Sequence, residues 1–431
     1  MKTSLVFGVF LFTAACNVEA QSAPEPNWRA RLREAILRTA SQNPELAAME
    51  SRIEASRHRV PQAAVLPDPE IEVGIKDVPL SNLSLSRDDF TMQTVSARQR
   101  FPGAGKRSAA RRVAEAELAG DSAMHAEHVT ALAAEVADAF FELARLDRLL
   151  EIFGESRRRL EGAAKSAAER YRAGRGPQSD VLRANLDTTA LEERLLSLAA
   201  ERRGQAARFN SLQGLPVDAP VAPIGPVDPE PEPGLVADVT SRAERMSPAL
   251  AVASAQLRKA EEELDLARLE RRSDLTATAY YARRERFEDL AGASLAITLP
   301  FFHPKRLDER RAEMEALVSA ARADLEAART RLRRDILEAS AALERERELA
   351  RLYRSTILPQ AEINLLAASE AYEVGRMDFS TFVRAATDLD LYRSELAQRT
   401  AGIGRALASL QKASGLPLIP GTPSGVAHEQ Y

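Results

Sequence analysis

Hydrophobic residues recur at alternating steps of three and four along the stretch that follows Gly105. Arg157 alone breaks this apolar seam, which consists of Val129, Leu132, Val136, Ala139, Leu143, Leu146, Leu150, Phe153, Arg157, Leu160, Ala164, Ala167 and Tyr171. Such spacing predicts a helix that packs against others in a left-handed coiled coil. A helix from Lys106 to Tyr171 would measure about 100 Å, which is wider than a single globular domain.

Shorter helices are expected on either side of the long one. An amphipathic pattern predicts a helix from Trp28 to about Val60, ended by Pro61. The break Arg175-Gly176-Pro177 turns the chain into a further helix from Ser179 to Leu212.

Two pairs of short strands are predicted between the helices. Alternating patterns mark Glu70 to Lys76 and Phe90 to Phe101 in the first half, and Asp274 to Arg283 and Ala291 to Pro300 in the second. Each is roughly as long as a tilted strand that crosses a bilayer.

The second half of the chain repeats the first about 200 residues later. The recurring pairs are Asn43-Pro44-Glu45-Leu46 with Ser247-Pro248-Ala249-Leu250, Phe101-Pro102 and Lys106-Arg107 with Leu299-Pro300 and Lys305-Arg306, Tyr171-Arg172-Ala173-Gly174-Arg175 with Tyr372-Glu373-Val374-Gly375-Arg376, and Gly214-Leu215-Pro216 with Gly415-Leu416-Pro417. Each half predicts a helix, a hairpin, a long helix and a shorter helix.

The domain boundaries follow from this duplication. We expect a first repeat over 28–215 and a second over 235–417, followed by a tail over 418–431. The segment 216–234 contains seven prolines and is expected to be a linker without helix.

The first 20 residues resemble an export signal, with Lys2 before an apolar run from Leu5 to Ala15. Two processing sites compete. Thr13-Ala14-Ala15-Cys16 resembles a bacterial lipobox with lipidation on Cys16, whereas Val18-Glu19-Ala20 suits cleavage before Gln21.

Composition and motifs argue against an enzyme or a nucleic-acid-binding protein. The net charge is −4, and basic and acidic residues alternate along helix faces. Cys16 is the only cysteine, and His125 and His128 lack a nearby third ligand, so we expect no resident metal site. We expect neither catalytic residues nor a cofactor.

Four strands per chain are too few for a barrel, which needs at least about eight. An open four-stranded sheet in lipid would leave its edges unpaired. Three chains would together supply about twelve strands, while a soluble sheet packed on helices is the alternative.

Together these features resemble the TolC family of outer-membrane efflux channels. The motifs that carry the resemblance are Asn43-Pro44-Glu45-Leu46, Arg100-Phe101-Pro102-Gly103-Ala104-Gly105-Lys106-Arg107, the turns at Tyr171 and Tyr372, and Ile357-Leu358-Pro359-Gln360-Ala361. The strand-to-helix junction is most similar to the heavy-metal (CusC/CzcC-like) branch, whose members work with resistance-nodulation-division pumps.

The resemblance implies a mainly α fold with a small β part. Three protomers would form a periplasmic α-barrel of long-helix hairpins, continued by a 12-stranded transmembrane β-barrel in the bacterial outer membrane. The implied partners are a periplasmic adaptor and an inner-membrane pump.

The resemblance also supplies candidate site residues. The helix-helix turns would lie at the periplasmic mouth, where the candidates for adaptor contact and gating are Tyr171, Gly174, Arg175, Tyr372, Gly375 and Arg376. Arg183 and Arg384 stand where many members carry a constricting acid, so the constriction candidates are Asp180, Asp378 and Asp388. Pro359 is expected to kink its helix.

The expected function is a passive exit duct, with heavy-metal cations as the favoured cargo. Drugs or other small molecules are the alternative cargo. A periplasmic adaptor or a coiled-coil scaffold is the alternative class of protein. An adaptor usually has one helical hairpin in a β-rich body, whereas this chain predicts two hairpins and little β structure. A scaffold predicts no strand pairs at equivalent places in both halves.

Overall fold

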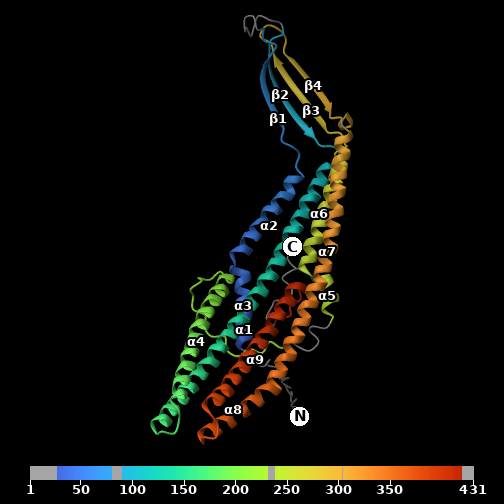
Figure 1. The fold of residues 1–431 in the computed structure, drawn as a ribbon. Coiled ribbons are helices and arrows are strands. Elements are labelled where there is room, and N and C mark those ends of the chain that lie inside the picture. The colour runs from blue at the N-terminus through green and yellow to red at the C-terminus, as the bar shows by residue number, and fades with distance from the viewer. Residues whose placement is uncertain (1–26, 80–89, 232–237, 303, 420–431) are drawn as a thin grey trace, which may run out of the picture.

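The computed structural model describes residues 27–79, 90–231, 238–302 and 304–419. The expected signal with Cys16, the tip of the first strand loop and the tail from residue 420 lie outside these residues. The described chain is long and narrow, with a sheet at one end and two helix-helix turns at the other (Figure 1). None of the described helices combines the length and apolar character needed to cross a membrane.

The first repeat is built on α3 (Lys106–Arg172), the helix expected from the apolar seam. Its seam residues Leu132, Val136 and Leu143 are at most 5% exposed. Helix α2 (Pro44–Ala63) lies along the sheet-proximal half of α3, and α4 (Gln178–Leu212) lies along the other half (Figure 1). Two short helices therefore accompany one long helix, as predicted.

The expected single helix from Trp28 to Val60 is wrong, because the structure divides it into α1 (Asn27–Gln42) and α2. Asn43 adopts an extended conformation, with φ −70° and ψ 124°, because the following proline disfavours the helical region. Its side chain accepts a hydrogen bond from the Glu45 amide at 2.8 Å and so caps α2.

The second repeat has the same order of elements: α5 (Val239–Met246), α6 (Pro248–Leu269), a strand pair, α7 (Pro304–Leu352), α8 (Leu358–Glu373) and α9 (Phe379–Ser414). A π-helical turn over Tyr353–Ile357 separates α7 from α8, and Pro359 lies in the first turn of α8. The long helix of this repeat is thus interrupted next to Pro359, where the proline removes a backbone donor.

The four strands form one antiparallel sheet in the order β1 (Glu70–Lys76), β2 (Met92–Phe101), β3 (Leu275–Arg283) and β4 (Leu290–Ile297). Strand β2 pairs with β3, so the sheet joins the two repeats. Strand β1 has the predicted bounds, but two other strands are shorter than predicted: β2 begins after Phe90, and β4 ends before Pro300, which opens the 3₁₀ turn Pro300–Phe302.

The two faces of the sheet differ in polarity. One face carries the paired row Ile71, Ala97, Ala279 and Ala293, and the opposite face carries the neighbouring row Glu70, Arg98, Thr278 and Ser294. Ile71, Val73 and Leu295 are more than 60% exposed. A barrel wall with lipid on one side and water on the other shows this alternation.

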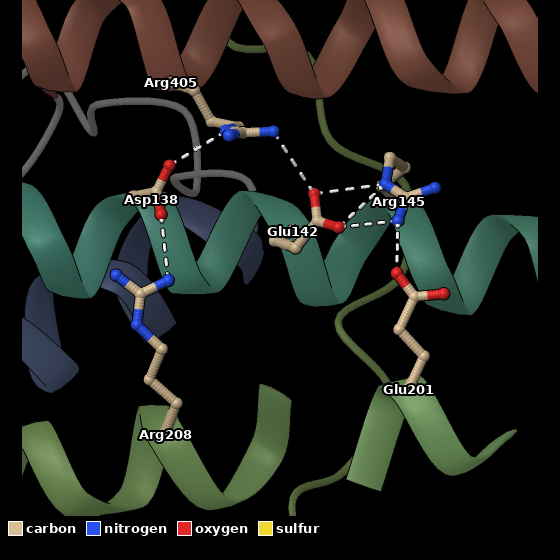
Figure 2. A network of polar contacts seen from close by, with 6 residues as sticks. All are labelled: Asp138, Glu142, Arg145, Glu201, Arg208 and Arg405. Atoms are coloured by element: carbon tan, nitrogen blue, oxygen red, sulfur yellow. Dashed lines mark hydrogen bonds and ion pairs between the residues drawn. The ribbon is translucent and has the colours of Figure 1, made fainter. Parts of the chain in front are cut away.

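The main core lies where α1, α3, α4 and α9 meet. Four aromatic rings pack there in the order Trp28, Phe141, Phe140 and Phe209, with the centroids of successive rings 5.8–6.2 Å apart. Beside this core, the polar network in Figure 2 ties α4 and α9 to α3. Asp138 accepts hydrogen bonds from Arg405 Nε at 2.8 Å and from Arg208 Nη1 at 3.2 Å.

The described part of the proline-rich linker crosses the helices near this core without forming a helix. Arg31 donates to the Ala222 carbonyl at 3.0 Å, and Asp147 accepts from the Ile224 amide at 2.8 Å. Ile224 is 5% exposed. The segment is therefore fastened to α1 and α3 through its own backbone.

Candidate functional site at the helix-helix turns

The two helix-helix turns have the same backbone geometry. Gly174 and Gly375 both have positive φ, +71° and +73°. The amides of Arg175 and Arg376 donate to carbonyls five residues earlier, each at 2.8 Å. Both turns therefore close with a Schellman-type bond that needs a left-handed residue, which explains the two glycines of the repeated motif.

A small apolar cluster joins the two hairpins just above these turns. It contains Leu160 of α3, Ala184 of α4, Tyr372 of α8, and Phe379 and Val383 of α9. The Tyr372 ring stacks on Phe382 at 5.4 Å between centroids and meets Phe379 edge-on at 5.6 Å. One end of the molecule thus has its own core, separate from the main one.

Arg170 links the first turn to the second. Its Nη1 atom donates to the Tyr372 carbonyl at 2.8 Å, and its guanidinium lies 4.8 Å from the centre of the Tyr372 ring. The second repeat has no equivalent contact, because the matching residue is Ala371. The link between the turns is therefore asymmetric.

The six turn candidates differ in accessibility. Tyr171 is 46% exposed and Tyr372 is 7% exposed. Arg175, Arg376 and both turn glycines are exposed. The side chains of Tyr171, Arg175 and Arg376 are thus accessible from solvent, while the Tyr372 ring is part of the packing that holds the turns together.

Two of the three candidate acids lie close together. Burial raises the pKa of Asp180, and the neighbouring Asp378 carboxylate adds to this rise while Arg170 opposes it. Asp378 caps α9, and hydrogen bonds from Ser380 and Thr381 lower its pKa. Asp388 is half-buried about 15 Å further along α9, so the structure does not group it with the other two.

A buried acid that the sequence did not single out lies on α9, about one turn beyond Ala386 and two turns beyond Val383. Asp390 is 4% exposed, accepts a hydrogen bond from Ser156 at 2.5 Å and forms an ion pair with Arg159. The pairing joins α9 to α3. A carboxylate within the apolar stripe of α9 was the signal available in the sequence.

A groove of about 980 Å³ lies between α3 and α8 beside the turns. Its wall includes the aliphatic residues Leu365 and Leu366, and its rim carries both charge types, including Arg170, Arg175 and Glu373. Leu366 is 61% exposed. An amphipathic helix with a mixed-charge border matches this chemistry.

The opposite end of the helices has a different polar centre at the strand-to-helix junction. Asp274, which is 5% exposed, accepts hydrogen bonds from Lys106 at 2.7 Å, Arg100 at 2.6 Å and the Gly103 amide at 2.8 Å. Burial by itself would raise the Asp274 pKa, but these three donors outweigh it and lower the pKa to about 2. Arg100, Gly103 and Lys106 of the junction motif therefore all donate hydrogen bonds to one carboxylate of the other repeat.

Among the described residues, no three histidine, cysteine or acidic side chains lie close enough to hold a metal ion. His128 instead contacts Glu45, with Nε2 2.9 Å from the carboxylate oxygen.

A family model described as "Outer membrane efflux protein" matches residues 35–215 and 239–416. The cobalt-zinc-cadmium resistance protein CzcC of Cupriavidus metallidurans is 24% identical over 350 residues, which cover 81% of each chain. Among solved structures, the outer membrane protein VceC of Vibrio cholerae has a TM-score of 0.76 at 19% identity, covering 91% of this chain and 99% of VceC. CusC has a TM-score of 0.71 at 14% identity, covering 89% of this chain and 92% of its own.

The matches confirm the resemblance stated from the motifs and exclude the adaptor and scaffold alternatives. They also confirm the expectation that the protein is not an enzyme, since the family consists of transport channels. The duplicated hairpins, the two-faced sheet and the family match lead to one conclusion: this chain belongs to the outer membrane efflux protein family, as an outer-membrane channel of the TolC type with a periplasmic helical tunnel.

Proposed function

We propose that three copies of this chain form the exit duct of a tripartite efflux system that carries heavy-metal cations. The duct is passive, and a periplasmic adaptor connects it to an inner-membrane resistance-nodulation-division pump. The observation that carries the metal assignment is the similarity to a protein named for cobalt, zinc and cadmium resistance, which extends over 81% of both chains. The strand-to-helix junction motif supports the same branch.

The turn end is the proposed adaptor contact and gate. Tyr171, Arg175 and Arg376 supply exposed groups of the kinds that anchor protein interfaces, and Gly174 and Gly375 permit the tight reversals that present them. The groove between α3 and α8 is the proposed seat for a helix of the adaptor. Tyr372 acts indirectly, since its ring holds the two turns together.

The three candidate acids have different proposed places in the duct. Asp180 and Asp378 lie together beside Arg170 and would contribute negative charge at the entrance. Asp388 lies further along α9 and would contribute inside the tunnel.

The metal cargo is tested by deleting the gene in its host and measuring growth inhibition. We expect greater sensitivity to cobalt, zinc or cadmium salts, reversed by a plasmid copy, with unchanged sensitivity to organic antibiotics and detergents. Unchanged metal tolerance combined with greater sensitivity to organic compounds would instead assign a small-molecule cargo.

The adaptor contact is tested with Arg175→Glu, Arg376→Glu and the double variant. We expect each to reduce the adaptor recovered with the affinity-tagged channel, and the double variant to reduce it most, with the oligomeric state unchanged. Arg258→Glu, an exposed change on α6, is the matched control. Full adaptor recovery with the double variant would remove these arginines from the contact.

A further inference from the structure

The two strand-to-helix junctions of the chain are equivalent in sequence but differ in their partners. At the first junction, Lys106 binds Asp274, which precedes β3. At the second junction, the matching Lys305 is exposed and has no ion pair or hydrogen bond among the described residues. One junction is therefore satisfied within the protomer and the other is not.

The strand register identifies the residue that would complete the second junction. Glu70 pairs with Arg98, three residues before Phe101, and Thr276 pairs with Ala296, three residues before Leu299. Phe101 and Leu299 are the equivalent residues of the two repeats. Glu70 and Thr276 are therefore equivalent as well.

Asp68 lies two residues before Glu70, as Asp274 lies two residues before Thr276. The two aspartates thus occupy matching positions, one before each hairpin. Asp68 is exposed and, within the described ranges, has no polar partner. Each protomer consequently leaves one acid and one amine unpaired at matching positions.

Asp68 and Lys305 cannot satisfy each other within one protomer, because they belong to opposite edges of the sheet. Asp68 precedes the edge strand β1, and Lys305 follows the edge strand β4. When protomers close a barrel, β4 of one pairs with β1 of the next, and this pairing repeats the internal pairing of β2 with β3. The internal β2–β3 contact is the one that brings Lys106 to Asp274.

From this geometry we infer that Asp68 of each protomer forms an ion pair with Lys305 of the adjacent copy, and that this pair fastens the base of the barrel between protomers. The inference rests on the trimer of the proposed function. Arg306 is not assigned to this contact, because it lines a shallow hollow with Glu270, Glu309 and Glu313 of its own repeat. The Asp68 carboxylate has fewer donors than Asp274, since Thr298 stands at the second junction where the first has Arg100.

Zero-length carbodiimide cross-linking of the full-length protein in detergent tests the pair, since this reagent joins only a carboxylate and an amine in contact. The chain has seven lysines, so the linked peptides can be assigned by mass spectrometry. The Asp274–Lys106 link, from groups 2.7 Å apart in one protomer, is the internal positive control. We expect an Asp68–Lys305 link in bands of dimer and trimer size.

Variants check the assignment. Asp68→Asn and Lys305→Met should each remove this link and leave the Asp274–Lys106 link in place. The double variant Asp68→Lys with Lys305→Asp should restore an intermolecular link, now between an amine at position 68 and a carboxylate at position 305.

Native mass spectrometry of the same sample separates the two claims. A trimer that yields the control link but no Asp68–Lys305 link would overturn the ion pair and leave the channel assembly standing. A monomer would overturn both.

Discussion

The guanidinium of Arg170 covers the ring of Tyr372 and donates to its carbonyl at 2.8 Å, so one side chain of the first repeat fastens the turn of the second. The contact is specific to the folded chain, since the residues are 202 positions apart. This contact therefore links the ends of the two hairpins.

Replacing Arg170 with Met should loosen the second turn. The cation–π contact and the hydrogen bond together contribute about 1–2 kcal/mol, so amide hydrogen exchange in residues 371–382 should become about tenfold faster. Arg172→Met, an exposed change two residues away, should leave exchange in that segment unchanged. Equal exchange in both variants would mean that Arg170 does not hold the turns together.

Two substitutions at Tyr372 distinguish the contribution of its ring to stability from that of its hydroxyl. Its hydroxyl is buried without a hydrogen-bond partner in the described structure, so Tyr372→Phe should keep or raise stability, by up to about 1 kcal/mol. Tyr372→Ala should cost about 3–5 kcal/mol, because it empties the centre of the turn cluster. Urea unfolding followed by circular dichroism measures both changes. If Tyr372→Phe proves strongly destabilising, the hydroxyl has a partner in the assembled channel.

Asp274 makes the junction sensitive to acid. Because its pKa is lowered to about 2 in the folded protein, its stabilising contribution is present above the unfolded pKa, near 4, and is lost as pH falls toward 2. The loss amounts to about 2 kcal/mol. In Asp274→Asn this component should be absent, so the stability of variant and wild type should converge as pH falls from about 4 to 2. A constant difference across that range would contradict the assigned pKa.

Gly404 allows α9 to approach α3. A Cβ atom at this position would lie 2.5 Å from the Phe141 ring, so Gly404→Ala should destabilise the protein by about 1–3 kcal/mol in urea unfolding. Adding Phe141→Leu should recover part of that loss, because it removes the overlapping ring atoms. Gly204→Ala, with nothing within 4 Å of the added atom, should be stabilising by up to about 1 kcal/mol. A neutral Gly404→Ala would mean that the two helices are further apart.

Much of the fold was readable from the sequence because its repeats are long and regular. The apolar seam predicted α3 to within one residue at its C-terminal end, and β1 has the predicted bounds. The break at Asn43 was missed, although the proline after it disfavours helix at that position. The apolar pattern continues on both sides of Pro44, and it therefore predicted one continuous helix.

The site was less predictable, because its decisive contacts join distant parts of the chain. The turn motif located Gly174 and Gly375, but nothing in it indicates that Arg170 covers Tyr372 or that Arg159 pairs with Asp390. Asp274 was likewise invisible as the partner of Lys106, since the pairing depends on how β2 meets β3.

Native mass spectrometry of the protein, extracted from the outer-membrane fraction in mild detergent, tests directly whether the barrel is shared between copies. We predict a trimer, in which three copies of the four-stranded sheet together supply a twelve-stranded barrel. A monomer recovered from the soluble periplasmic fraction would contradict the shared barrel and with it the proposed exit duct.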